Sequence, residues 1–262
     1  MKRLLIILTA LIVMPVTRMA AQDTLRGCWI GLSWGSGLGY FYDQGAGPLL
    51  FTGLEVHPAL SFHLEQERWR LEASIPVSGG LYLRSLLEAD PDVLAVMPEL
   101  RGEVQWQLLR HGRWRLLAGG GLAEVLDFRN YQQLQNNSTG LSNFLLLKVS
   151  GRGELYLGRW VFHSQLMFSP VGYAYRPGYA YIANYDQTMQ DPTADMLGEH
   201  HGYVVGAPSL GFDLGTTVTI RNGNRIGFAY RWHHLTSRST ELCPHRFDRA
   251  SHALTVTAMI KL

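Results

Sequence analysis

Apolar and polar residues alternate with a period of two through unusually long segments of this 262-residue sequence. In PELRGEVQWQLL, residues 98–109, one alternate set is Pro, Leu, Gly, Val, Trp and Leu, and the other is Glu, Arg, Glu, Gln and Gln before the closing Leu. A period of two is the spacing of side chains on one face of a β-strand. These segments are longer than the usual strand of about five or six residues. The sequence therefore predicts an all-β fold with long strands.

Ten such segments cover the chain, at 28–42, 49–64, 69–81, 96–109, 114–128, 143–156, 160–174, 203–219, 225–238 and 251–262. Four connections are tight, at 65–68, 110–113, 157–159 and 221–224, and the others are mostly longer. Short turns at one end and long loops at the other are typical of an up-and-down transmembrane β-barrel, with the short turns in the periplasm. We expect a single antiparallel barrel of about ten strands, within a range of eight to twelve, with both termini on the periplasmic side.

The tight turns predict how neighbouring strands align. A four-residue loop at 65–68 puts Leu64 opposite Trp69, with both side chains on the same face. The Gly-containing turns at 111–112 and 222–223 keep matching faces only as type I turns followed by a Gly bulge. One assignment of inner and outer faces then fits every turn.

The first 21 residues have the layout of a secretory signal peptide. Lys2 and Arg3 precede an apolar run at 4–16, and small residues stand at Ala20 and Ala21. The apolar run is too short to span a bilayer as a helix. We expect cleavage near Ala21 and a single barrel domain over 22–262; a buried N-terminal helix is the alternative.

Composition separates the membrane barrel from other classes. Charged residues make up 17% of the sequence and the formal net charge is +2, against about 25% charged residues in a soluble domain. Such a small, dispersed charge offers no surface for nucleic acid, so we expect no nucleic-acid partner. The alternative, a soluble β-sandwich or lipocalin-like barrel, would expose a Gly-rich and weakly charged face to water while burying bulky residues along every strand.

An Arg-Trp pair recurs directly after three of the tight turns, with its tryptophans at Trp69, Trp114 and Trp160. In membrane barrels, aromatic residues collect at the two interfaces between bilayer and water. We therefore predict that these tryptophans form the girdle on the periplasmic side.

The polar alternate set is predicted to face the lumen. A ten-strand barrel is only slightly wider than the eight-strand size that side chains can fill. We therefore expect ion pairs and trapped water to close it against wide diffusion, and we favour a structural network over an acid–base site. The predicted lumen network is Glu55, His57, His63, Arg70, Glu72, Glu99, Arg101, Glu103, Lys148, Arg152, Glu154, His163, Asp213, Arg231 and His233.

The chain as a whole resembles the small outer-membrane β-barrel proteins of Gram-negative bacteria, and the Ala21-Gln22 junction resembles those of the Bacteroidota. The resemblance implies export to the outer membrane, assembly by the outer-membrane assembly machinery, and contact with outer-membrane lipids and lipopolysaccharide. The last strand ends in Leu262, where many such proteins have an aromatic residue. We expect a monomer without a cofactor. Its favoured function is non-enzymatic, presenting the loops at 176–201 and 239–250 to ligands or partners outside.

Enzymatic activity stays open as an alternative. Outer-membrane acyl hydrolases that trim lipid A or phospholipids carry a His-x-Ser pair on a strand, with a third polar group orienting the His. RWHHLTSRS, residues 231–239, places His234 and Thr236 on the outward face, with Thr where Ser is wanted. In this alternative the catalytic residues are His234, Thr236 and Glu241. No Asp-His arrangement like that of ten-strand outer-membrane proteases stands out.

A metal or haem site is a further alternative. Extending the hairpin of 203–219 and 225–238 would set two loop histidines opposite a Cys and a third His, which are suitable zinc ligands. The candidate ligands are His200, His201, Cys243 and His245.

The two cysteines lie at opposite ends of the predicted barrel. Cys28 begins the first strand and Cys243 lies in the last long loop, so about 25 Å of barrel height separates them. A disulfide needs Cα atoms within roughly 7 Å. We therefore expect two free thiols.

Overall fold

The computed structural model describes residues 26–44, 47–84, 92–131, 139–175, 201–220, 222–237 and 246–262. The predicted signal peptide lies outside these residues. Eleven strands are described: β1 (Gly27–Asp43), β2 (Gly47–Val56), β3 (Ala59–Glu65), β4 (Trp69–Leu83), β5 (Val93–His111), β6 (Trp114–Tyr131), β7 (Thr139–Leu157), β8 (Trp160–Tyr175), β9 (His201–Thr219), β10 (Arg225–Ser237) and β11 (Phe247–Lys261). Among the residues described, no helix is long and apolar enough to cross a membrane.

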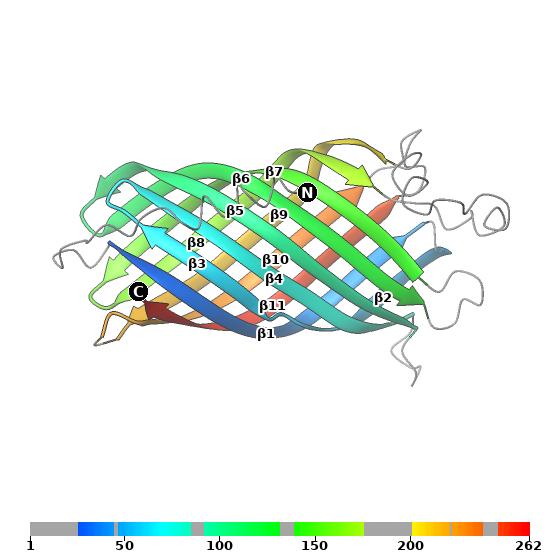
Figure 1. Cartoon of the computed structure of the whole chain (residues 1–262), viewed down its shortest axis with the longest axis horizontal. Coiled ribbons are helices and arrows are strands. Elements are labelled where there is room, and N and C mark those ends of the chain that lie inside the picture. The colour runs from blue at the N-terminus through cyan, green and yellow to red at the C-terminus, as the bar shows by residue number, and fades with distance from the viewer. Residues whose placement is uncertain are drawn as a thin grey trace.

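The strands form one antiparallel sheet that closes on itself, because β11 pairs with β1 over its whole length (Figure 1). β2 and β3 are two halves of one strand, interrupted at His57 and Pro58, and their register with β1 and β4 is the same on both sides of the break. Proline has no backbone N–H to give to the ladder. The wall therefore has ten strands, which confirms the predicted up-and-down barrel.

The two ends of the barrel differ. The turn end carries the short connections β3–β4, β5–β6, β7–β8 and β9–β10 and the C-terminal Leu262, whose N–H donates to the carbonyl of Cys28 at 2.9 Å. The loop end carries the other connections, on the right in Figure 1. Neighbouring strands are joined alternately at the two ends, as an up-and-down meander requires.

The β3–β4 turn is tighter than the sequence predicts. Leu64 pairs with Leu71 rather than with Trp69, and the N–H of Gln66 donates to the carbonyl of Trp69 at 2.8 Å. Only residues 67–68 form the loop. The difference is two residues, so the side chains keep the predicted faces.

The two strands of the β5–β6 hairpin keep matching inner and outer faces, but the bulge that makes this possible is not at the predicted position. His111 pairs directly with Trp114, and the extra residue is Leu108, further along β5, rather than Gly112. In the β9–β10 turn, Gly223 has a φ of +82° and donates its N–H to Ile220. Both turns need a glycine where φ is positive.

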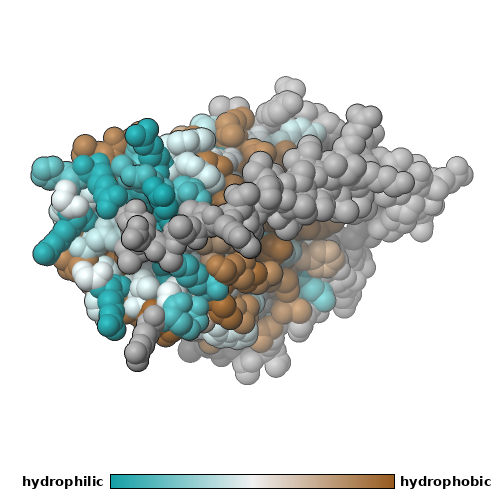
Figure 2. All heavy atoms as spheres, turned by 60° about the vertical axis from the view of Figure 1, so that its left-hand side comes forward, coloured by the Kyte–Doolittle hydropathy of each residue, from teal (hydrophilic) through white to brown (hydrophobic). Residues whose placement is uncertain are grey.

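Large apolar side chains cover the outer face of the wall. Figure 2 shows a hydrophobic band beside the hydrophilic turn end. Such an outer surface suits hydrocarbon and not water. Exposed members of this surface include Leu32, Trp34, Leu38, Leu54, Leu60, Leu122, Leu166, Leu214, Leu254 and Ile260. Of the three predicted girdle residues, Trp114 and Trp160 are exposed next to the turn end and Trp69 is half-buried there.

Candidate functional site

Side chains occupy the inside of the barrel along its described length. Next to the turn end they are mainly charged, and next to the loop end they are mainly apolar. The charged group includes Glu65, Arg70, Glu72, Glu103, Arg115, Arg152 and Glu154. The apolar group is Phe41, Phe51, Tyr82, Val93, Ala95, Met97, Ala123, Val125, Tyr131, Phe144, Leu146, Ala174, Leu235 and Phe247.

Arg70 is the centre of the charged group. Its guanidinium lies 2.7 Å from Glu72, 3.5 Å from Glu154 and 3.7 Å from Glu65. Arg152 donates from Nε to Glu154 at 2.7 Å. These groups come from two separate hairpins, β3–β4 and β7–β8, so their ion pairs join strands that are distant along the chain. Paired in this way, buried charges avoid the large penalty of an isolated charge.

A second set of bonds crosses the barrel interior. Lys148 donates to Glu99 at 2.6 Å, and both side chains are buried. Glu103 accepts from Ser150 and from Gln165, the latter at 3.2 Å. Strands β5, β7 and β8 are thereby connected through the lumen and not only through the wall.

The remaining predicted lumen residues on β8, β9 and β10 also face inward. Arg231 pairs with Asp213 in the register of the β9–β10 ladder, with Nε 3.7 Å from the carboxylate. Ser209 and His233 share a hydrogen bond of 2.8 Å between Oγ and Nε2. His163 lines an internal cavity.

That cavity has a volume of about 70 Å³ and lies among the charged groups. Arg101, on its wall, donates from Nε to Ser74 at 3.3 Å. His163 Nδ1 and Arg231 Nε are buried there without a hydrogen-bond partner among the described residues, although Arg231 Nε keeps its longer ion pair with Asp213. A polar cavity of this size holds a few water molecules, which would satisfy these atoms.

Ser61, His63 and Glu72 have the spacing of a hydrolase triad. Ser61 Oγ lies 2.9 Å from His63 Nε2, and His63 Nδ1 lies 3.4 Å from Glu72. Arg70, however, approaches the same Nδ1 at 3.2 Å and can only donate. This leaves the proton on Nε2, where a base would have to accept one from Ser61. The group is therefore a structural network.

Glu55 links the charged and apolar groups. It accepts from Arg249 at 2.6 Å and from the hydroxyl of Tyr82, and it lies 3.1 Å from His57. Arg249 also donates to Ser78 at 3.0 Å. The sequence predicts a loop at 239–250, so Arg249 is absent from the predicted lumen network. Alternation does extend this far, since Phe247, Arg249 and Ala253 all face inward.

Arg129 is buried among the apolar side chains, with 1% of its surface exposed. It pairs with Asp43, lies 3.3 Å from Asp127 and donates to Ser142 at 3.1 Å. Its guanidinium also stacks over the ring of Phe247, 4.8 Å from the centroid. The predicted strand ends at residue 128, so this cluster was not predicted from the sequence.

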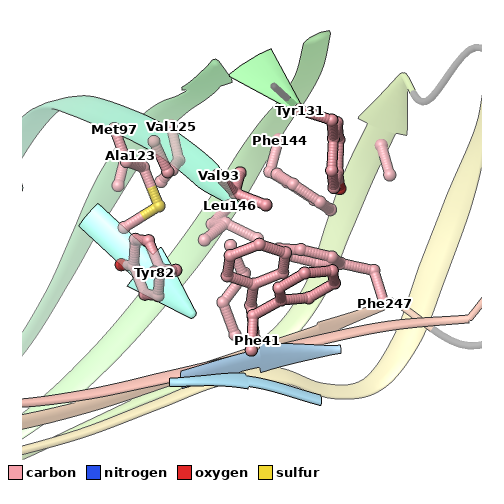
Figure 3. Close-up of a cluster of buried hydrophobic side chains, with 14 residues drawn as sticks. Phe41, Tyr82, Val93, Met97, Ala123, Val125, Tyr131, Phe144, Leu146 and Phe247 are labelled. Atoms are coloured by element: carbon pink, nitrogen blue, oxygen red, sulfur yellow. The ribbon is translucent and has the colours of Figure 1, made fainter. Parts of the chain in front are cut away.

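The apolar group differs from the polar lumen that the sequence predicts. Phe41 stacks on Phe51 at 4.9 Å between ring centroids and meets the edge of Tyr82 at 4.9 Å (Figure 3). The sequence feature that could have predicted the apolar group is the continuous apolar runs, such as 93–97 and 144–147. Such runs are typical of strands that are buried on both faces.

In the alternative catalytic site on the outer face, Asp248 rather than Glu241 lies beside His234 and Thr236. Thr236 donates to Asp248 at 2.5 Å, and His234 Nε2 lies 4.0 Å from the same carboxylate. Four ångströms is too long for a hydrogen bond. Glu241 lies outside the described residues. The hydroxyl that would act as the nucleophile thus points to a carboxylate rather than to the imidazole.

The candidate metal ligands are largely untested by the structure. His200, Cys243 and His245 lie outside the described residues, and the backbone of His201 opens β9 opposite Tyr175. Among the side chains that are described, no three His, Cys, Asp or Glu residues are placed to hold a metal ion. The zinc or haem site stays a prediction.

Cys28 is a buried free thiol at the turn end, opposite Leu64. Its predicted counterpart, Cys243, lies outside the described residues. The expectation of two free thiols therefore stays a prediction for the second cysteine.

No known protein family and no curated protein matches the sequence. The solved structure of the outer membrane protease OmpT from Escherichia coli is similar over 93% of this chain and 99% of OmpT, with a TM-score of 0.53 and 9% identity. The transport unit of the autotransporter AIDA-I from Escherichia coli matches over 97% of this chain and 96% of its own, with a TM-score of 0.45 and 9% identity. The translocator domain of NalP from Neisseria meningitidis matches over 98% and 94%, with a TM-score of 0.43 and 8% identity.

At such low identity, the likeness to OmpT shows the fold alone, which is that of an outer-membrane β-barrel. It does not carry the protease activity over to this chain. The more specific resemblance to Bacteroidota proteins stays a prediction.

Proposed function

We propose that this protein is a closed barrel of the outer membrane, without enzymatic activity, that presents its loop-end connections to ligands or partners outside the cell. The connections concerned are 176–201 and the predicted loop 239–250, of which the structure assigns Phe247 and the residues after it to β11. The apolar outer wall and the likeness in fold to OmpT support the membrane setting. Signal-peptide cleavage remains part of the proposal.

The many buried side chains inside the barrel are the observation that supports this proposal. Arg249 reaches from β11 over β1 to Glu55 on β2 and to Ser78 on β4, and Lys148 reaches from β7 over β6 to Glu99 on β5. The apolar group also lies inside the barrel, towards the loop end (Figure 3). We infer that solutes have no open path through such an interior, so transport is not the function that the geometry favours. What is left for contact with the outside is the loop end.

Conductance measurements test the closed lumen. We expect the purified full chain, inserted into a planar lipid bilayer, to give no steady open-channel steps, because buried ion pairs hold the charged group together. A general porin inserted into the same bilayer serves as the positive control. Steady steps from the parent protein would contradict the proposal directly.

Thiol labelling tests which end faces outside. A membrane-impermeant maleimide added to intact cells is expected to label Cys243, in the last long connection, and to spare Cys28, which is buried at the turn end. The variant Cys243→Ser should remove the label, and Cys28→Ser should leave it unchanged. Labelling of Cys243 only after cell disruption would place the loop end in the periplasm.

A lipid acyl hydrolase remains the second candidate, because Asp248 supplies a carboxylate beside both His234 and Thr236. Such an enzyme would remove an acyl chain from lipid A or a phospholipid. Mass spectra of lipid A and phospholipids from cells with and without the protein separate the two functions. An acyl profile that does not change with the protein excludes the hydrolase.

A further inference from the structure

We propose that a patch on the outer wall binds the phosphorylated sugar headgroup of an outer-leaflet glycolipid. This rim patch lies at the loop-end termini of three neighbouring strands, β10, β11 and β1. Its members are Trp232, His234, Thr236, Arg246, Asp248 and Tyr42. The inference is independent of what the loops bind.

Asp248 is the centre of the rim patch. It accepts from Thr236 Oγ1 and from Arg246 Nε, each at 2.5 Å, and lies 4.0 Å from His234 Nε2. In the register, Asp248 stands between Thr236 on β10 and Tyr42 on β1. Thr236 and His234 on β10 and Arg246 just before β11 thus bring hydroxyl, imidazole and guanidinium groups to one carboxylate, and Tyr42 is its backbone neighbour on β1.

The rim patch is also packed against the wall. The rings of Trp232 and His234 are parallel within 6°, with centroids 6.3 Å apart. Ala250, which lies between His234 and Tyr40 in the register, is fully buried although its position faces outward. The aromatic faces carry partial negative charge, which attracts the C–H groups on the face of a sugar ring. The packing fixes these rings before a ligand arrives.

Arg246 provides the group that suits a phosphate. Its side chain is 61% exposed, and within the described part of the chain its Nε bonds Asp248 while its two Nη groups have no other partner. A guanidinium can bind phosphate with two parallel hydrogen bonds. Its backbone is held in place, because Gln44 and Arg246 exchange a backbone bond of 2.9 Å and a side-chain bond of 3.1 Å.

The Asp248 carboxylate limits which phosphate-containing ligands the rim patch can bind. Asp248 repels a bare phosphate, so a simple anionic phospholipid gains little here. A ligand that brings hydroxyl or amide donors together with a phosphate satisfies Asp248 and Arg246 at the same time. A phosphorylated amino-sugar headgroup has both. In an outer-membrane barrel, the loop end lies at the outer leaflet, where such glycolipids are found.

Lipid binding to the purified full chain in detergent micelles tests the rim patch, with native mass spectrometry as the readout. The probes are diphosphoryl lipid A, monophosphoryl lipid A and phosphatidylglycerol. We expect diphosphoryl lipid A to bind most tightly. Arg246→Gln and Trp232→Leu should each weaken it about tenfold or more, as expected when a charge-assisted bond or a stacked ring is lost.

Arg84→Gln is the matched control. Arg84 also lies at the loop end and pairs with an aspartate, Asp92, at 3.2 Å, but between β4 and β5. This variant should bind lipid A like the parent. Equal binding of phosphatidylglycerol and lipid A, or parent-like binding by Arg246→Gln, would overturn the proposal. Recovery of the bound lipid with an acyl chain missing would support the site and would assign it to the second candidate function.

Discussion

Replacing Arg129 by Met is expected to destabilise the barrel by about 3–5 kcal/mol, the usual cost of breaking a buried ion pair from one side. Asp43 and Asp127 are both fully buried and would lose their contact with the guanidinium inside the apolar group. The stacking of the guanidinium on Phe247 would be lost as well. The free energy of unfolding by urea, measured for the protein folded into phospholipid vesicles, checks this result.

Two further variants sharpen this experiment. Arg113→Met, in the exposed β5–β6 turn, removes the same charge and should change the free energy of unfolding by less than about 0.5 kcal/mol. Asp43→Asn combined with Arg129→Met should recover part of the loss, because one unpaired carboxylate is removed. A single Arg129→Met variant as stable as the parent would mean that the cluster is not buried as described.

Placing an arginine at Leu122 is expected to destabilise the protein by about 2–4 kcal/mol, the cost of a charge on the lipid face near the middle of the bilayer. Leu122 lies midway along β6 and is 57% exposed. In water the same substitution at an exposed position would matter little. The free energy of unfolding from vesicles therefore distinguishes a membrane wall from the outer face of a soluble barrel.

Leu116→Arg provides the depth control for this test. Leu116 is also exposed on β6, but it lies two residues from Trp114 at the turn end. Near the interface an arginine on the lipid face costs only about 0–1 kcal/mol. Equal effects at the two positions would argue against a bilayer around the barrel.

The sequence predicts which side chains face the lumen and which face outward, because the alternation of polar and apolar residues is long and regular. In β4, Arg70 and Glu72 stand on one alternate set and Leu71 on the other, and a register error of two residues at the β3–β4 turn does not change this. Positions at the loop end were harder to assign. Arg129 and Arg249 flank polar, Gly- or Pro-containing stretches, which resemble loops by composition, and only the paired ladders show that both belong to strands.

To predict a candidate site, it is not enough to know which face a side chain lies on; the residues that contact it must also be known. His234 and Thr236 were placed on the outer face from the sequence, with Glu241 as the expected third group. The structure instead brings Asp248 to them, because β10 and β11 pair Thr236 with Asp248 across the intervening connection. No spacing along the chain indicates which of several carboxylates a closing strand will bring to a given side chain.

By itself, the sequence determined that the chain forms a closed wall of long antiparallel strands with one apolar face, because a side-chain period of two leaves each strand only two possible orientations. Only the tertiary structure decided what meets inside and along that wall. Arg249 and Glu55 are 194 residues apart in the chain and come within bonding distance, over the inner face of β1, only after β11 has closed onto β1. The stagger of the strands at closure sets such contacts, and that stagger is a property of the whole barrel rather than of any one segment.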